Sequence, residues 1–230
     1  MKPLVILGTG GYGQEVLWIV DDLNAITPTW DFLGFIDPGE PQKRGQTYYD
    51  RPVLGGWDDL PNLAGDVFFA CGIGAPKDRR KECAEAERRG LKPATLIHPS
   101  AVIARHVELG EGTLVGAGSI IAPYARLGRH CALNIHVGVG HNSRLGDFCV
   151  LSPAAQVLGA VILEDGVFMG TNATVFLGRR IGAGALIGAN SFVVSNLAAG
   201  FSAIGVPATA FTPHEGAGIC TAQESKQQVR

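Results

Sequence analysis

The sequence predicts a small α/β domain followed by a parallel β-helix, and three observations carry this prediction. An aliphatic residue recurs at every sixth position through the second half of the chain, and a column of mostly small residues follows four positions later. Near the N-terminus, a glycine-rich loop follows a short apolar run. The 230 residues include 32 glycines and only 7% aromatic residues, which is unusual for an ordinary globular core. This length allows one large domain or two small ones.

The first predicted domain, residues 1–95, alternates strands with helices. Apolar runs at 4–7, 32–37 and 66–73 are typical of buried parallel strands. Amphipathic or charged stretches at 14–23 and 76–89 predict helices. This alternation favours a parallel sheet of three or four strands.

A nucleotide-binding pattern lies between the first strand and the first helix. Gly8, Gly10 and Gly13 have the spacing G-x-G-x-x-G, and Asp37 closes the next strand. Such glycines let a pyrophosphate approach a helix N-terminus, while the acid holds a ribose hydroxyl. Only half of a two-part dinucleotide fold fits before residue 97, so a single nucleotide or a nucleotide sugar fits better than a dinucleotide. A tight turn without a ligand remains the alternative, because a lone glycine loop is a weak signal.

The second predicted domain, residues 96–211, follows the six-residue period. The seventeen positions from 97 to 193 that lie six apart are all aliphatic or Met. Neither a helix nor a plain strand gives a strict period of six, whereas a chain that bends after every short strand does. Three such faces close one coil, so residues eighteen apart stack at about 4.8 Å, and glycines after many marked positions take the strained corners. The polar segment 212–230 loses the pattern, and we assign it no function.

This pattern resembles that of the hexapeptide-repeat acyltransferases, whose parallel β-helix is left-handed and whose prisms pack as trimers. Further motifs narrow the resemblance to sugar acyltransferases of the sialic acid O-acetyltransferase and nucleotide-4-amino-sugar N-acetyltransferase type. These motifs are G-T-G-G-Y-G at 8–13, F-I-D-P at 35–38, H-N at 141–142 and G-V-P-A at 205–208. The fold class that follows is an α/β Rossmann-like half domain, then a left-handed parallel β-helix. A cytoplasmic homotrimer with active sites between subunits is implied.

The implied reaction is direct acetyl transfer from acetyl-CoA to the amino group of a nucleotide-linked amino sugar. An ammonium is not a nucleophile, and histidine is suited to remove its proton near neutral pH, so His141 is the expected general base. Asn142 stands where the family commonly has Asp or Glu; its amide oxygen can still fix the imidazole tautomer. Gly159, eighteen residues beyond the base, offers a backbone N–H to the oxyanion.

Other site residues are assigned to the two substrates. Ala189 joins Gly159 in the expected acetyl-CoA site. The residues expected to bind the nucleotide sugar are Gly10, Gly11, Tyr12, Asp37 and Asn134. Tyr12 replaces a histidine that is often found in this loop of the family, which bears on substrate identity more than on reaction type.

Two alternative functions remain open, and a third, an oxidoreductase inferred from the glycine loop alone, fails. An O-acetyltransferase acting on a sialic-acid-like sugar would use the same histidine to deprotonate an alcohol. A non-catalytic or metal-binding trimeric β-helix would need converging histidines, but His130, His136 and His141 have offsets that place them on different faces or corners, so no metal is expected. His106, His130 and His136 are predicted on or near the outer surface. An oxidoreductase would need the second nucleotide half.

Composition excludes other classes of partner. The chain has 19 Lys+Arg against 21 Asp+Glu and no dense basic stripe, which argues against nucleic-acid binding. No apolar run is long enough to span a bilayer. The odd number of cysteines, five, suggests reduced thiols in a cytoplasm. Cys131 and Cys149, eighteen apart in the inward column, are expected to stack as small buried side chains.

Overall fold

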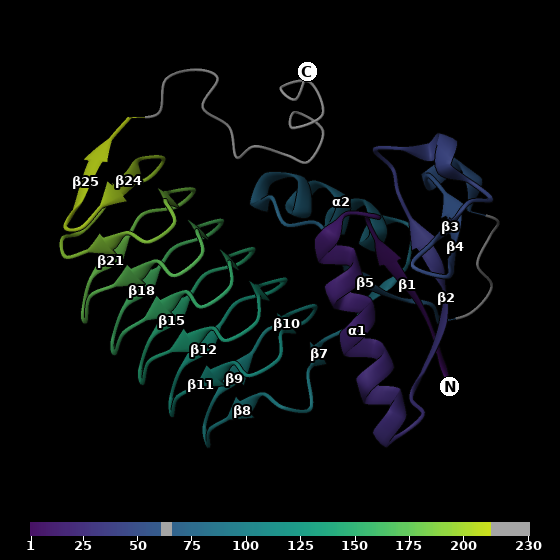
Figure 1. Ribbon diagram of the computed structural model, residues 1–230, viewed down its shortest axis with the longest axis horizontal. Coiled ribbons are helices and arrows are strands. Elements are labelled where there is room, and N and C mark those ends of the chain that lie inside the picture. Colours follow the sequence, from purple (N-terminus) through teal and green to yellow (C-terminus); the bar gives the residue numbers. More distant parts are fainter. Residues whose placement is uncertain (61–65, 213–230) are drawn as a thin grey trace.

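The computed structural model describes residues 1–60 and 66–212, which form an α/β unit and a triangular prism packed side by side (Figure 1). The coils of the prism stack from β7 (Leu96–Ile97) and β8 (Val102–Ile103) at one end to β24 (Ser202–Gly205) and β25 (Ala208–Phe211) at the other, and the α/β unit lies along the side that carries β7 (Figure 1). Apart from Thr212, the polar tail predicted for 212–230 lies outside the described residues.

The α/β unit contains a six-stranded sheet in the order β3-β4-β2-β1-β5-β6, in which only the β3–β4 pair is antiparallel. Its strands are β1 (Lys2–Leu7), β2 (Trp30–Ile36), β3 (Thr47–Tyr48), β4 (Arg51–Gly55), β5 (Phe68–Cys71) and β6 (Lys92–Pro93). The predicted sheet of three or four strands was too small. Strands β3, β4 and β6 have two to five residues and no long apolar run, so periodicity does not reveal them.

Two helices cover the faces of this sheet. Helix α1 (Gly11–Ile26) begins three residues earlier than predicted, directly at the glycine loop. Helix α2 (Pro76–Arg88) begins at its proline, which suits the first position of a helix. Because side chains alternate along β1, Leu4 and Ile6 pack with α1, whereas Val5 and Leu7 pack in the cluster that contains α2.

The prism consists of three sheets, one for each face of the coil, and their strands pair in parallel except for the antiparallel pair of β24 and β25. The first sheet contains β7 (Leu96–Ile97), β10 (Leu114–Val115), β13 (Ala132–Leu133), β16 (Val150–Leu151), β19 (Phe168–Met169), β22 (Leu186–Ile187), β24 (Ser202–Gly205) and β25 (Ala208–Phe211). The second contains β8 (Val102–Ile103), β11 (Ile120–Ile121), β14 (Gly138–Val139), β17 (Gln156–Val157), β20 (Thr174–Val175) and β23 (Phe192–Val193). The third contains β9 (Glu108–Leu109), β12 (Arg126–Leu127), β15 (Arg144–Leu145), β18 (Ile162–Leu163) and β21 (Arg180–Ile181).

The register of these sheets confirms the predicted stacking. Leu114 pairs with Ala132 and Val115 with Leu133, so each residue lies beside the one eighteen positions later. The marked aliphatic residues from Val115 onward fill the interior with the small residues of the second column. Cys131 and Cys149 are fully buried there as free thiols, as predicted.

The corner glycines serve a different purpose from the one predicted. The left-handed backbone conformation occurs three residues after a marked position, for example at Gly118 (φ 67°), and not directly after the mark. Glycines directly after the mark are required because the next coil passes too close. A Cβ on Gly116 would lie 2.8 Å from the carbonyl carbon of Asn134. Close approach between coils, rather than positive φ, therefore explains these glycines.

Candidate functional site

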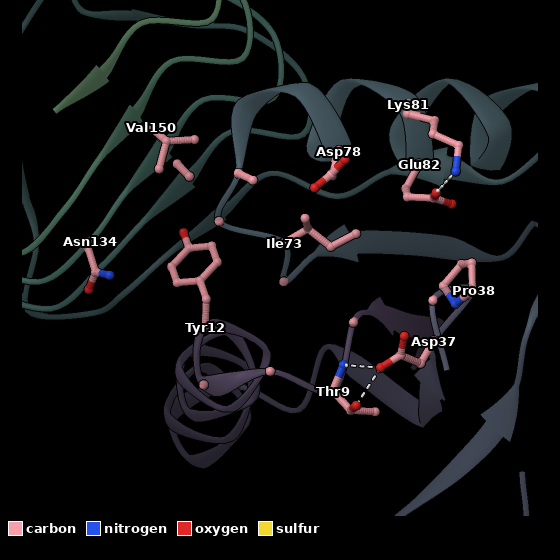
Figure 2. A pocket seen from close by; sticks show the side chains of 18 of the residues that line it. Thr9, Tyr12, Asp37, Pro38, Ile73, Asp78, Lys81, Glu82, Asn134 and Val150 are labelled. Carbon is pink, nitrogen blue, oxygen red and sulfur yellow. Dashed lines mark hydrogen bonds and ion pairs between the residues drawn. The ribbon is translucent and has the colours of Figure 1, made fainter. Parts of the chain in front are cut away.

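The α/β unit contains a pocket of about 520 Å³ at the carboxyl ends of β1, β2 and β5. Strand β1 pairs with β2 on one side and with β5 on the other. The carboxyl end of β1 is therefore a topological switch point, the place where open α/β sheets bind ligands. The glycine loop, the start of α2 and the first sheet of the prism form its walls (Figure 2).

The glycines of this pocket fall into two groups. A Cβ on Gly13 would overlap the carbonyl oxygen of Gly8, and one on Gly72 would lie 2.6 Å from the Cα of Gly13, so packing requires both glycines. Gly10, Gly11 and Gly74 also line the pocket, yet a Cβ on any of them would meet nothing within 4 Å. None of these three has a positive φ. Neither packing nor backbone conformation explains why these three positions are glycine, whereas a ligand that approaches the backbone closely would explain it.

Helix α1 presents its N-terminus to this space. The N–H of Gln14 is bonded to Gly10 O at 3.3 Å, so the amides of Gly11, Tyr12 and Gly13 have no acceptor within the helix. Unpaired amides and the positive end of the helix dipole together favour an anion such as a phosphate.

Asp37 lies at one end of the pocket and holds the glycine loop. Its carboxylate accepts hydrogen bonds from the Thr9 hydroxyl and from the Thr9 amide at 3.1 Å (Figure 2). The Glu40 amide donates to its other oxygen at 3.1 Å. The side chain is nearly buried but still lines the pocket. Holding this loop is therefore one role of Asp37; ribose binding stays a prediction.

Tyr12 and Asn134 lie at the other end, where the α/β unit meets the prism (Figure 2). Among the described residues, the buried Tyr12 hydroxyl has no hydrogen-bond partner. Burial raises the pKa of this hydroxyl, so it stays neutral and can donate. Asn134 accepts a bond from the Ile135 amide at 2.7 Å, which fixes its side chain toward α1.

His141 lies on an exposed corner of the prism, between β14 and β15. Its Nδ1 is 2.9 Å from Asn142 Oδ1, and because an amide oxygen only accepts, we assign the proton to Nδ1 and the free lone pair to Nε2. Asn142 has a φ of 61°, a left-handed conformation that Asn tolerates well. The ring is therefore oriented with its basic nitrogen available.

Gly159 lies beneath this ring in the next coil. A Cβ on Gly159 would be 2.6 Å from His141 Nε2 and 2.8 Å from Cε1. Within the described part of the chain, the Gly159 amide has no hydrogen-bond acceptor. The structure thus brings an imidazole and an unpaired backbone N–H together, which suits proton removal beside a developing oxyanion.

Two sets of predicted residues are not brought together within one chain. Ala189 follows β22 at the corner between the first and second sheets, whereas Gly159 follows β17 at the corner between the second and third. The pocket is lined by Asn134 and Ser152 from the first sheet and its corner, and His141 is not among its lining residues. Within one chain, the predicted catalytic pair His141 and Gly159 and the predicted pocket residues therefore lie on different edges of the prism, and we refer to these two predicted groups as half-sites.

One histidine was predicted wrongly. His106 and His136 are exposed as expected, but His130 is only 1% exposed. Its ring stacks between Phe69 and Phe148, with centroids 5.9 and 5.1 Å away, because the α/β unit covers this corner. Burial lowers the pKa of His130, although Glu87 bonded to its Nε2 at 2.9 Å opposes this. In the ranges 1–60 and 66–212, no three His, Cys, Asp or Glu side chains gather as a metal would require.

Arg79 was missed, because the stretch 76–89 was interpreted as a solvated helix face. The structure places its side chain at 0% exposure between the pocket and the prism. The signal was present: Arg79, Cys83 and Ala86 follow the spacing of a buried helical stripe.

Residues 3–86 match the family model of the PglD N-terminal domain. UDP-N-acetylbacillosamine N-acetyltransferase of Bacillus subtilis (strain 168) is 34% identical over 116 residues, which are 49% of this chain and about half (50%) of that relative. Perosamine N-acetyltransferase of Caulobacter crescentus, solved with CoA and GDP-perosamine as a variant with one histidine replaced by asparagine, is 31% identical. That match covers 93% of this chain and 98% of the other, with a TM-score of 0.83.

The chain belongs to the nucleotide-amino-sugar N-acetyltransferase family. A second structure of the Caulobacter enzyme is 32% identical, covers 92% of this chain and 98% of the other, and has a TM-score of 0.80. WeeI of Acinetobacter baumannii AYE is 26% identical over 92% of this chain and all (100%) of its own, with a TM-score of 0.82.

Family membership confirms the resemblance and the fold class predicted from the sequence, a Rossmann-like half domain before a left-handed parallel β-helix. Of the helices within the described residues, none has the length and apolar character needed to cross a membrane.

Proposed function

We propose that this N-acetyltransferase family member transfers an acetyl group directly from acetyl-CoA to the amine of a nucleotide-linked amino sugar. The observation that carries the proposal is the His141 ring held over Gly159, with Nδ1 bonded to Asn142 and Nε2 free. CoA and GDP-perosamine, bound together in the solved relative, support the choice of both substrates.

The proposed chemistry needs one base and one oxyanion donor. Nε2 of His141 takes a proton from the amine while the amine nitrogen attacks the thioester carbonyl. The Gly159 N–H donates to the oxyanion that forms. Collapse of the tetrahedral intermediate forms the amide and breaks the C–S bond. The CoA thiolate leaves and takes up the proton that the imidazole holds. The Asn142 side chain keeps the imidazole oriented throughout.

The nucleotide would lie in the α/β pocket. Its diphosphate is assigned to the N-terminus of α1, at Gly10 and Gly11, where helix amides are unpaired. Asp37 would bind the ribose at one end, and Tyr12 and Asn134 would contact the sugar at the other.

Assembly as a homotrimer with active sites between subunits would join the two half-sites. The separation of His141 from the pocket within one chain supports this part of the proposal, as do Val102 and Ile120, which are more than half exposed on the second sheet. Ala189 would then complete the acetyl-CoA site of a neighbouring chain. A cytoplasmic location fits the need for acetyl-CoA.

The test is turnover by the purified full chain. UDP-, GDP- and dTDP-linked 3- and 4-amino sugars would be offered with acetyl-CoA, and thiol release and product mass followed. Acetylation of at least one amine is expected, with no thiol release from sugars that carry only hydroxyls. Acetylation of a sialic-acid-like sugar, with all amino sugars inert, would overturn the proposal in favour of O-acetyl transfer.

Two glycine variants separate ligand contact from packing in the pocket. Gly11→Ala should raise the KM for the nucleotide sugar about tenfold or more, because its Cβ enters only the space assigned to the diphosphate. Its melting temperature should be unchanged or slightly higher. Gly13→Ala should instead destabilise the fold by about 1–3 kcal/mol, because its Cβ overlaps the Gly8 carbonyl. Thermal unfolding and steady-state kinetics measure both; an unchanged KM in Gly11→Ala would leave the pocket without its assigned ligand.

A further inference from the structure

Arg79 of α2 is a buried cation, and no carboxylate of the described residues lies within hydrogen-bond reach of its guanidinium. Its Nε donates to the carbonyl of His130 in the prism at 2.7 Å. Its Nη1 donates to the carbonyls of Cys71 and Ile73 at 2.6 and 3.1 Å. A guanidinium does not lose its proton in proteins, so a full positive charge stands here at 0% exposure. Such a charge is costly unless something compensates it.

The bond to Ile73 controls the next amide. A trans peptide is planar, so the N–H of Gly74 points opposite to the carbonyl of Ile73. Because that carbonyl points to Arg79 behind the pocket wall, the Gly74 N–H is turned toward the pocket, which Gly74 lines. This amide has no acceptor among the described residues, and no neighbouring atom lies where a Gly74 Cβ would be.

The charge balance of the pocket shows why this donor is needed. The ionised side chains of its lining are four carboxylates and one ammonium, namely Asp37, Glu40, Asp78, Glu82 and Lys81. The ammonium itself pairs with Glu82 at 3.0 Å (Figure 2). Lys43, behind the lining, pairs with Asp37 at 3.9 Å and with Glu40, which leaves the surroundings of the pocket with a net negative charge. A diphosphate would meet net repulsion from these side chains, so its binding needs backbone amides and further positive charge.

Two buried donors point to the same requirement. Arg79 Nη2 and the Tyr12 hydroxyl both lack partners in the described part of the chain. Tyr12 lies in the pocket wall. Native buried donors are nearly always paired, so a hydroxyl of this kind in a pocket wall is available to donate to a bound ligand.

We propose that Arg79 is a positioning residue of the nucleotide site, which turns the Gly74 amide toward the diphosphate and supplies the positive charge that the lining lacks. The Tyr12 hydroxyl, in the wall of the same pocket, donates to the sugar part of the same nucleotide-linked ligand. This inference rests on the proposed function, because it concerns the anionic part of the nucleotide-linked substrate.

The test compares Arg79→Met, Arg79→Lys and Tyr12→Phe with the wild-type chain, and uses Arg88→Met as the control. Arg88 is an exposed arginine of the same helix, and among the described residues Glu85 is its one ion-pair partner. Calorimetry would give the Kd of UDP, GDP and dTDP, and of the nucleoside of whichever binds best; the KM for acetyl-CoA and the melting temperature complete the set.

Arg79→Met should raise the Kd of the nucleoside diphosphate at least tenfold and the Kd of the nucleoside less than twofold. The KM for acetyl-CoA should stay unchanged. Arg79→Lys should recover part of the loss, because it keeps the charge but not the forked geometry. Tyr12→Phe should raise the nucleotide-sugar KM severalfold without lowering the melting temperature, because it removes a buried unpaired hydroxyl. Arg88→Met should behave as wild type.

Equal losses for diphosphate and nucleoside in Arg79→Met would reduce Arg79 to a structural residue and overturn the inference. An unchanged KM in Tyr12→Phe would do so for the hydroxyl, and this variant keeps the test open if Arg79→Met does not fold. Failure of the wild-type chain to bind any of the three nucleotides would contradict the proposed function instead.

Discussion

Replacing His141 by alanine is expected to lower kcat by about 10³-fold, because a positioned general base contributes roughly 10²–10⁴-fold to proton transfer. No described side chain other than Asn142 bonds to the ring, and an amide cannot replace it as a base. Stopped assays of product formation at saturating substrates would measure the loss.

The His141→Ala substitution should not alter the fold or its stability. His141 is exposed, and its ring packs in no core cluster of the described residues, so His141→Ala should keep the wild-type melting temperature, oligomer mass and CoA affinity. A variant that keeps all three and also turns over at the wild-type rate would remove His141 from the mechanism.

Gly159→Ala should lower kcat about 100-fold while the chain still folds. The added Cβ would lie 2.6 Å from His141 Nε2, so the exposed ring must swing away. A displacement of about 1 Å at a reacting group can cost on the order of 10²-fold in rate. The flexible ring moves at little cost, so the melting temperature should change by no more than a few degrees. Steady-state kinetics and thermal unfolding of the same preparation measure both quantities.

Gly140→Ala provides the contrast on the same corner. Its Cβ would meet the backbone nitrogen of Gly159 at 2.5 Å, and backbone cannot swing aside. The main effect of Gly140→Ala should therefore be a lower melting temperature, whereas the main effect of Gly159→Ala should be a lower kcat. Wild-type kcat in Gly159→Ala would show that the ring position beside Gly159 is not the reactive one.

The prism could be predicted almost residue by residue because a strict period leaves few geometries. A coil of three bent strands places residues eighteen apart in contact, so the stacking of His141 against Gly159 follows from counting once the coil is recognised. The α/β sheet was less predictable. Its edge strands, such as β6 (Lys92–Pro93), are stabilised by pairing with a neighbour rather than by any pattern of their own.

Contacts between the two units could not be predicted from local patterns. His130 and the exposed His136 both lie three residues after a marked position, at successive corners of the coil. Phe69 covers His130 but not His136. Arg79 looks like one charge among many until the prism supplies the carbonyl of His130 as its acceptor. Which corner a second unit covers depends on tertiary packing, and no period in the chain encodes it.

The eighteen-residue register also limits how this enzyme can change length. Loss or gain of one residue inside a coil would exchange interior and surface for everything that follows, whereas a whole coil can be added or removed with the alternation intact. Insertions within the coils that preserve the fold therefore come in whole coils of eighteen residues, and each added coil shifts the far end of the prism by about 4.8 Å. A duplicated coil placed between Asn134 and His141 would carry the base away from Asn134 by that step and would move Ser152, on the same pocket wall, with it. Selection can therefore change the distance from the base to the start of the pocket wall only in discrete increments.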